Sequence, residues 1–99
     1  MKYRFIHRPA VGYDIEDAFD YYHRISPRLA RQFLKRIREA QNHISKYPES
    51  FEVKYKEVRT VLLKQFPYHI HYLVDEKRKL IIILAVVHAY RKPKDYSNR

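Results

Sequence analysis

The spacing of apolar residues changes along the chain and separates strand-like from helix-like segments. Residues 2–7 alternate well enough for a short strand, which Arg8-Pro9 ends because proline has no N–H to donate to a sheet. From Val11 to Ile25 apolar side chains recur every three or four residues, which lines one face of an amphipathic helix. The first quarter of the chain therefore predicts a strand followed by a helix.

A second helix is predicted from Pro27 to Tyr47. Ser26 suits the N-cap of this helix, and Pro27 suits its first position, where a missing N–H is harmless. Apolar residues keep the helical spacing as far as Tyr47, and Pro48 then stops the helix. Because little more than Ser26 separates the two helices, we expect them to pack as a tight antiparallel hairpin.

After Pro48 the apolar period becomes two, which predicts strands. We expect a short edge strand over residues 52–56 and further strands over residues 58–63, 66–74 and 80–87. Every side chain from Leu80 to Val87 is apolar, which is typical of a strand in the middle of a sheet, covered on both faces. The order strand, helix, helix and antiparallel meander predicts the α+β class.

The polar turn at residues 75–79 sets the pairing of the last two strands. If it centres on residues 76 and 77, His69 lies opposite Leu84, His71 lies opposite Ile82, and His88 faces position 65. All three histidines then share one face of the sheet, with His88 far along the strand. A slip of one residue moves side chains to the other face, so this register is a conditional prediction.

Composition limits the class of protein. The chain has 99 residues, a formal charge of +10 and no cysteine, so we expect one domain over residues 1–99 without disulfides or thiolate chemistry. The longest apolar run, residues 80–87, is far shorter than the ~20 residues of a membrane span, and we expect a cytoplasmic protein. The charge favours a polyanionic partner: nucleic acid, a ribosome or an acidic protein.

The two predicted helices carry opposite charge. The first has an acidic face, which suits the helix dipole and solvation: Asp14, Glu16, Asp17 and Asp20. The second has a basic stripe that is either solvated, paired with the first helix or docked to an acidic partner: Arg28, Arg31, Lys35, Arg36, Arg38 and Lys46. Neither Glu16 with Asp20 nor His69 with His71 has enough neighbouring ligands for a metal, so we predict no metal site.

Three segments of the chain stand out together. They are Tyr21-Tyr22 and Ser26-Pro27 with Ala30 and Phe33, then Phe66-Pro67-Tyr68-His69-Ile70-His71-Tyr72, then Ile83 to Pro93 with its ending His88-Ala89-Tyr90-Arg91-Lys92-Pro93. In this order and at this length they resemble the RelE/ParE superfamily of toxins from bacterial type II toxin–antitoxin systems, often labelled plasmid-stabilisation proteins. The resemblance covers nearly the whole chain.

The resemblance implies a helical hairpin on one face of a curved, mainly antiparallel sheet of four to five strands. It also implies a co-encoded antitoxin whose disordered, acidic C-terminal segment folds around the toxin and silences it, and no cofactor. ParE-like members poison DNA gyrase, whereas RelE-like members cleave mRNA in the ribosomal A site without a metal. Because residues 87–93 look more like the ParE side, gyrase inhibition is favoured, with the mRNA endoribonuclease as the alternative.

Candidate site residues lie mainly at the exit of the last strand, where the resembling toxins act. For a nuclease, which needs a base, an acid and cations, the catalytic candidates are His88, Arg91 and Tyr96, with His69 and Arg59 secondary. For target binding they are Arg91, Lys92, Lys94 and Tyr96. For antitoxin binding they are Arg28, Arg31, Lys35 and Arg38. Capping or packing is the alternative role of His88, and covering the core is the alternative role of Tyr96.

Two other classes of function compete with the toxin. A non-toxic basic module would use the same helix and tail only for contacts with nucleic acid or a ribosome. A small enzyme acting on a soluble metabolite is disfavoured, because a single glycine offers no phosphate-cradling loop and no nucleophile constellation is visible.

Overall fold

The computed structural model describes residues 2–99, and its elements follow the predicted order. They are strand β1 (Arg4–His7), helices α1 (Pro9–Ile25) and α2 (Pro27–Lys46), and strands β2 (Val53–Tyr55), β3 (Val58–Leu62), β4 (Tyr68–Asp75) and β5 (Leu80–His88). Helix α1 begins two residues before the predicted Val11, because Pro9 occupies its first turn instead of only ending the strand. Strand β4 begins at Tyr68, so Phe66 and Pro67 belong to the preceding loop.

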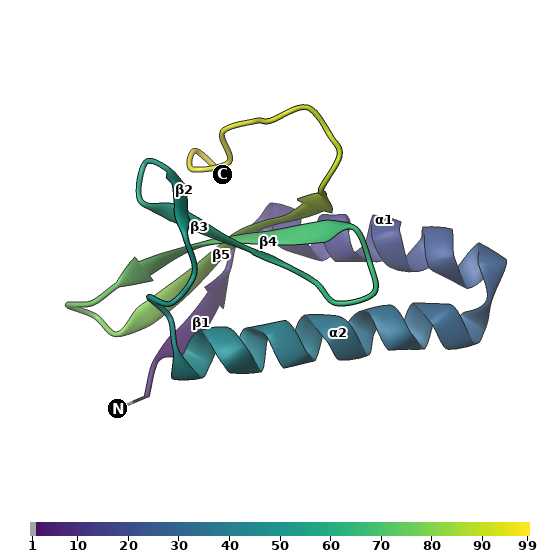
Figure 1. Cartoon of the computed structure of the whole chain (residues 1–99), viewed down its shortest axis with the longest axis horizontal. Helices are drawn as coiled ribbons and strands as arrows, with labels where there is room; N and C mark the ends of the chain where they lie inside the picture. Colours follow the sequence, from purple (N-terminus) through teal and green to yellow (C-terminus); the bar gives the residue numbers. More distant parts are fainter. Residues whose placement is uncertain (1) are drawn as a thin grey trace.

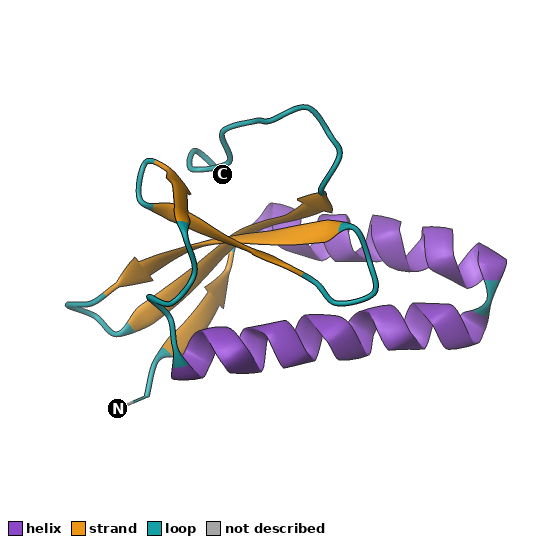
Figure 2. Cartoon of the chain, in the orientation of Figure 1, coloured by secondary structure: helices purple, strands orange, loops and turns teal. Residues whose placement is uncertain are grey.

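The strands form one mixed sheet in the order β1-β5-β4-β3-β2 (Figure 2). Strand β1 runs parallel to β5, and the other neighbours are antiparallel. The apolar strand β5 has neighbours on both sides and is the most buried strand, as its composition predicted, although β4 and not β5 occupies the middle position of the five. The predicted α+β architecture, with a helical hairpin on a mainly antiparallel sheet, is confirmed.

Helices α1 and α2 run antiparallel along one face of the sheet, and Ser26 joins them (Figure 1). The Ser26 hydroxyl accepts a hydrogen bond from the Leu29 N–H at 3.4 Å, as expected of an N-cap. Under the hairpin, Tyr22 and Phe33 pack against the Phe66 ring, with centroid separations of 4.8 and 5.3 Å. These edge-to-face contacts join helix residues to the β3–β4 loop and make the centre of the main core.

Strand β5 contains a bulge at Leu84. Ala85 pairs with His71 and Ile83 pairs with Tyr72, so Leu84 is an extra residue without a partner on β4. Leu84 and Ala85 consequently both pack on the sheet face opposite the helices, whereas Ile83 and Val86 on either side belong to the helix-covered core. The bulge therefore changes which face every later side chain of β5 occupies.

The predicted pairing of the histidines is wrong. Asp75 pairs with Leu80, so the turn contains four residues, and this alone shifts the register by two positions. The bulge adds a third position, and His88 pairs with Tyr68 instead of facing position 65. Because an odd shift exchanges the faces, His88 lies on the face opposite His69 and His71. His71 is also buried, at 8% exposure, and does not lie on a solvated face.

The C-terminal segment covers part of the face opposite the helices. After β5, residues 89–99 turn back over β5 and β4 as an irregular tail, on the side away from the helical hairpin (Figure 1). Tyr96 is buried there and closes a second, smaller apolar cluster with Val58, Leu84, Ala85 and Val87. The sheet is thus covered by two helices on one face and by a strap without regular structure on the other.

Candidate functional site

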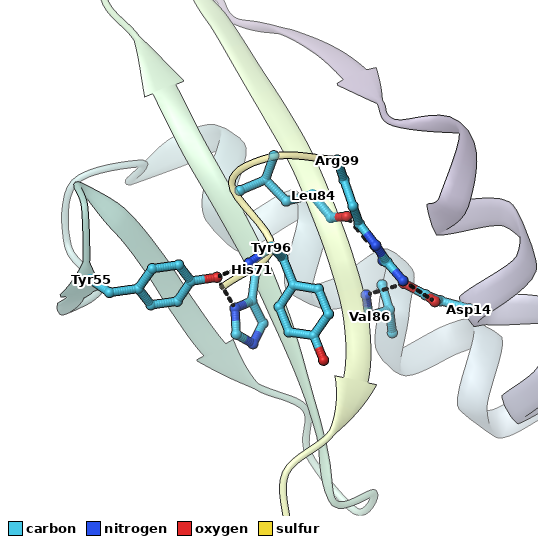
Figure 3. Close-up of polar contacts among 7 residues, drawn as sticks. All are labelled: Asp14, Tyr55, His71, Leu84, Val86, Tyr96 and Arg99. Atoms are coloured by element: carbon cyan, nitrogen blue, oxygen red, sulfur yellow. Dashed lines mark hydrogen bonds and ion pairs between the residues drawn. The ribbon is translucent and has the colours of Figure 1, made fainter. Parts of the chain in front are cut away.

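An ion pair fastens the end of the tail to α1. The Arg99 guanidinium donates to both carboxylate oxygens of Asp14, with Nη2 to Oδ1 at 3.1 Å (Figure 3). Asp14 also accepts the Val86 N–H at 3.0 Å, and Arg99 Nη1 donates to the Leu84 carbonyl at 3.2 Å. We call these two side chains, with the two backbone groups they bind, the clasp.

The clasp binds backbone groups of β5 that the bulge and the short strand β1 leave without a partner strand. Strand β1 pairs with β5 only as far as Ile83, so the next part of β5 has no strand on that side. Val86 N–H and Leu84 C=O are therefore free for side chains from α1 and from the tail. A charge-assisted, two-pronged pair in a partly buried place is among the stronger polar contacts in a protein.

A second set of contacts fixes the middle of the tail. The Tyr55 hydroxyl accepts the Tyr96 N–H at 3.2 Å and lies 3.0 Å from Nδ1 of His71 (Figure 3). The Tyr96 ring packs edge-on against the His71 ring at 5.1 Å, and the Arg99 guanidinium lies over the Tyr96 ring at 4.9 Å. Asp95, next in the tail, binds Lys56 at 2.6 Å. Strands β2 and β4 and the tail are thereby joined at one place.

A cavity of about 540 Å³ lies between the tail and residues of β2, β3, β4 and the end of β5, which includes His88. Cationic side chains line it from two sides: Lys54 and Lys56 beside β2, and Arg91, Lys92 and Lys94 in the tail. Its floor contains His69, His71 and Tyr96, and its one acidic residue is Asp95. The geometry favours a ligand or partner surface that carries negative charge.

His71 is neutral at physiological pH. Burial lowers the pKa of His71 to about 4, and the neighbouring charges of His69 and Arg99 act in the same direction. Burial also lowers the pKa of His69, and Lys54 adds to that effect. A neutral His71 agrees with its hydrogen bond, because the Tyr55 hydroxyl accepts from Tyr96 and then has its own proton to donate to Nδ1.

The predicted catalytic candidates His88, Arg91 and Tyr96 all line the cavity, but in different settings. The His88 ring packs edge-on against Tyr68 on the helix side of the sheet, and its Nδ1 accepts the Tyr90 N–H at 3.2 Å. Arg91 is exposed on the rim of the cavity, and Tyr96 is buried beneath the tail. His88, Arg91 and Tyr96 therefore differ in sheet face and exposure, and His88 has a local capping contact.

Arg59 lies away from the cavity. It pairs with Tyr72 on the helix-covered face, and its guanidinium donates to the Glu49 and Phe51 carbonyls at 3.1 and 2.6 Å. His69, the other secondary candidate, does line the cavity. Arg59 thus holds the loop that connects α2 to β2, and His69 is the secondary candidate that meets the tail.

The cations predicted to bind partners form two groups on the surface. Those of the tail are Arg91, Lys92 and Lys94, and they form no ion pair among residues 2–99. Those proposed for antitoxin binding lie along the exposed side of α2: Arg28, Arg31, Lys35 and Arg38. Each group is available to a partner.

Several residues that build the site were missed by the sequence analysis. Asp14 was assigned to helix stabilisation and solvation, whereas it holds Arg99 and a backbone N–H of β5. Arg99 and Tyr55 were not singled out at all. The alternation around His71 predicted the correct strand but not the bulge, and only the bulge and the tail explain why this side chain is buried.

Among residues 2–99, no group of three or more His, Cys, Asp or Glu side chains could hold a metal ion. Within the same residues, no helix has the length and apolar character needed to cross a membrane.

Comparisons with solved structures give the same fold. The ParDE toxin–antitoxin system of P. aeruginosa matches with a TM-score of 0.76 and 20% identity, over 87% of this chain and 95% of that one. The RelBE2 complex of Mycobacterium tuberculosis matches with a TM-score of 0.57 and 16% identity, over 89% and 99% of the chains. The archaeal RelE–RelB complex of Pyrococcus horikoshii matches with a TM-score of 0.54 and 20% identity, over 93% and 100%.

Comparison with protein families identifies the family as well as the fold. No curated protein sequence matches the chain. The family model described as ParE toxin of type II toxin-antitoxin system, parDE, matches residues 6–93, which include all the strands except the start of β1, both helices and the first part of the tail. The chain therefore belongs to the ParE toxin family, within the RelE/ParE superfamily that its sequence resembles.

Proposed function

We propose that this protein is the toxin of a type II toxin–antitoxin pair and that it arrests growth by inhibiting DNA gyrase. The observation that carries the proposal is the match of the ParE toxin family over residues 6–93. ParE-like toxins are the members of the superfamily that poison gyrase.

The tail is the part of the molecule that we expect to touch gyrase. Arg91, Lys92 and Lys94 are exposed on a segment held at both ends. At one end the Ala89 N–H donates to the Pro67 carbonyl at 2.7 Å, and at the other end the clasp holds Arg99. Holding both ends lowers the conformational entropy that the tail loses on binding, which favours tight association.

An antitoxin is the second partner that we propose. The three structural neighbours described above are toxin–antitoxin systems or complexes. The basic stripe of α2 is exposed and lies on a different part of the molecule from the tail: Arg28, Arg31, Lys35 and Arg38. An acidic segment that orders on binding would be attracted to such a stripe and steered along it.

The test is a supercoiling assay with purified gyrase, with and without this protein. We expect inhibition by the wild-type protein, and loss of inhibition when Arg91, Lys92 and Lys94 are all replaced by Gln. The matched control replaces Arg28, Arg31 and Lys35 by Gln, which removes the same charge from α2. This control keeps inhibiting gyrase but binds the product of an adjacent antitoxin gene more weakly, whereas the tail variant keeps that binding.

Two results would contradict gyrase inhibition. In a parallel assay on translating ribosomes, cleavage of mRNA by a protein that leaves supercoiling unaffected would make endoribonuclease activity the function. Tolerated expression with neither effect, together with nucleic-acid binding that weakens steeply with salt, would replace gyrase inhibition with a non-toxic binding module.

A further inference from the structure

The charged side chains that line the cavity under the tail are mainly cationic. Five cationic side chains line it, and the single acid among its lining residues is Asp95. Asp95 is already occupied, since it binds Lys56 at 2.6 Å and accepts from the Ser97 hydroxyl and N–H at 2.6 and 2.8 Å. An anion entering the cavity therefore meets positive charge without a free competing carboxylate from the lining.

His71 contributes a donor that carries no charge. Its Nδ1 lies 3.0 Å from the Tyr55 hydroxyl, and with the Tyr55 proton assigned to this contact the neutral ring carries its own proton on Nε2. Nε2 has no hydrogen-bond partner among residues 2–99, and no fully buried side-chain polar atom in those residues lacks one. His71 lines the cavity, and Nε2 is the ring nitrogen that its contact with Tyr55 leaves open to a ligand.

A chain of hydrogen bonds positions the His71 ring. The Tyr96 N–H donates to the Tyr55 oxygen at 3.2 Å, and the Tyr55 hydroxyl lies 3.0 Å from Nδ1 of His71. Turning the ring over would break the contact between Nδ1 and Tyr55. In the assigned tautomer His71 is thus a preorganised donor at the floor of the cavity, with exposed cationic side chains at its rim.

We propose that this cavity binds the phosphate group of a nucleotide, with the His71 Nε2–H donating to a phosphate oxygen and Arg91, Lys92 and Lys54 neutralising its charge. Lys54 also pairs with Glu52 at 3.0 Å, outside the lining, and would share its charge between the two. A phosphate monoester carries up to two negative charges and three acceptor oxygens, so it can accept from several of these donors together. The volume of about 540 Å³ lies within the range of small-molecule sites and leaves room for the rest of the nucleotide.

The proposal goes beyond gyrase inhibition, and its test needs no gyrase. Titrations followed by ¹H–¹⁵N NMR at constant ionic strength would use three probes: inorganic phosphate, thymidine monophosphate and a single strand of eight thymidines. We expect saturable shifts at His71 Nε2 and at the amides of residues 89–96 with all three. Equal affinity for the two nucleotide probes would identify a free nucleotide as the ligand, and tighter, more salt-dependent binding of the strand would identify a nucleic acid.

Two substitutions of His71 separate its donor role from its packing role. His71→Leu removes Nε2–H, and we expect affinity for thymidine monophosphate to fall about three- to tenfold, the usual effect of losing one hydrogen bond. His71→Gln places an amide N–H near the position of Nε2, and we expect it to restore most of the affinity. His23→Leu, on the exposed part of α1, is the control and should bind like the wild type.

Three results would overturn the proposal. The first is the absence of saturable shifts around the cavity with every probe. The second is shifts that follow the basic stripe of α2 in place of the cavity, which would indicate general charge attraction. The third is wild-type affinity in His71→Leu, provided that its amide spectrum shows the tail still folded over the sheet. If His71→Leu loses the tail, Lys54→Gln with Lys92→Gln provides the alternative test, and undiminished affinity there would also be decisive.

Discussion

The two faces of the sheet are covered in physically different ways. On one face, α1 and α2 bury a continuous aromatic and aliphatic core that includes Phe33, Ile44 and Ile83, all with no exposed surface. On the other face, the irregular tail covers a smaller cluster around Tyr96 and depends on polar contacts: the clasp, the Tyr55–His71 bond and the Lys56–Asp95 pair.

The two faces therefore contribute differently to global stability and to local opening. Apolar burial is non-directional and grows with area, so the helix-covered face supports the global fold. Polar contacts are directional and depend on charge, so the tail can open locally while the core remains packed. The candidate site lies on the side where local opening is least costly, which is where binding segments are generally found.

The largest effect is expected on the helix-covered face. Phe33→Ala leaves a cavity among Tyr22, Phe66 and Tyr68, and we expect the free energy of unfolding to fall by about 3–5 kcal/mol. Denaturant melts followed by circular dichroism measure this loss. Tyr13→Ala is the control, because Tyr13 is 70% exposed and its loss should change stability by no more than about 0.5 kcal/mol.

Breaking the clasp should reduce stability less than Phe33→Ala and should act more locally. Arg99→Gln leaves the Asp14 carboxylate without its main partner, and we expect a loss of about 1–3 kcal/mol. Hydrogen exchange should accelerate in residues 89–99 and at the Val86 amide before it changes in α2. Asp20→Asn, which removes an exposed carboxylate from the same helix as Asp14, is the control. Equal acceleration in both helices and the tail would mean that the two faces do not open independently.

Lowering the pH should reduce the stability of the protein, because His71 beneath the tail becomes protonated. The pKa of His71 is near 6.5 in the unfolded chain and is lowered to about 4 by burial in the folded protein. Between these values the unfolded state binds more protons, so this contribution to stability is present above about pH 6.5 and is lost as the pH falls towards 4. Melts at several pH values should show this slope, and it should be reduced in His71→Leu but retained in His23→Leu.

The smallest effect is expected for Lys56→Gln. The pair with Asp95 is exposed and screened by solvent, so its removal should leave the melting midpoint nearly unchanged. The pKa of Asp95, lowered to about 2 mainly by its hydrogen bond with Lys56, should rise towards its ordinary value. NMR titration of the Asp95 carboxyl carbon measures that change. A large drop in stability would show that the tail depends on this pair more than on the clasp.

The elements of this protein could be predicted from the sequence because each depends on neighbours along the chain. Helical spacing, the Ser26-Pro27 junction and the apolar run of β5 are local signals, and the structure has an element at each of them. The basic tail and the basic stripe of α2 were equally visible, because charge can be counted without knowing the fold.

The site itself depends on contacts between residues far apart in sequence. Nothing local marks Leu84 as a bulge, since it lies in an uninterrupted apolar run, yet this one residue moves His88 to the opposite face from His71. The clasp joins Asp14 to Arg99, 85 positions away, and the His71 network joins β2, β4 and the tail. The sequence by itself determined the helices, the strands, the interior position of β5 and the charge. Only the tertiary structure decided which side chains meet, because a side chain's face depends on a register that a single extra residue reverses.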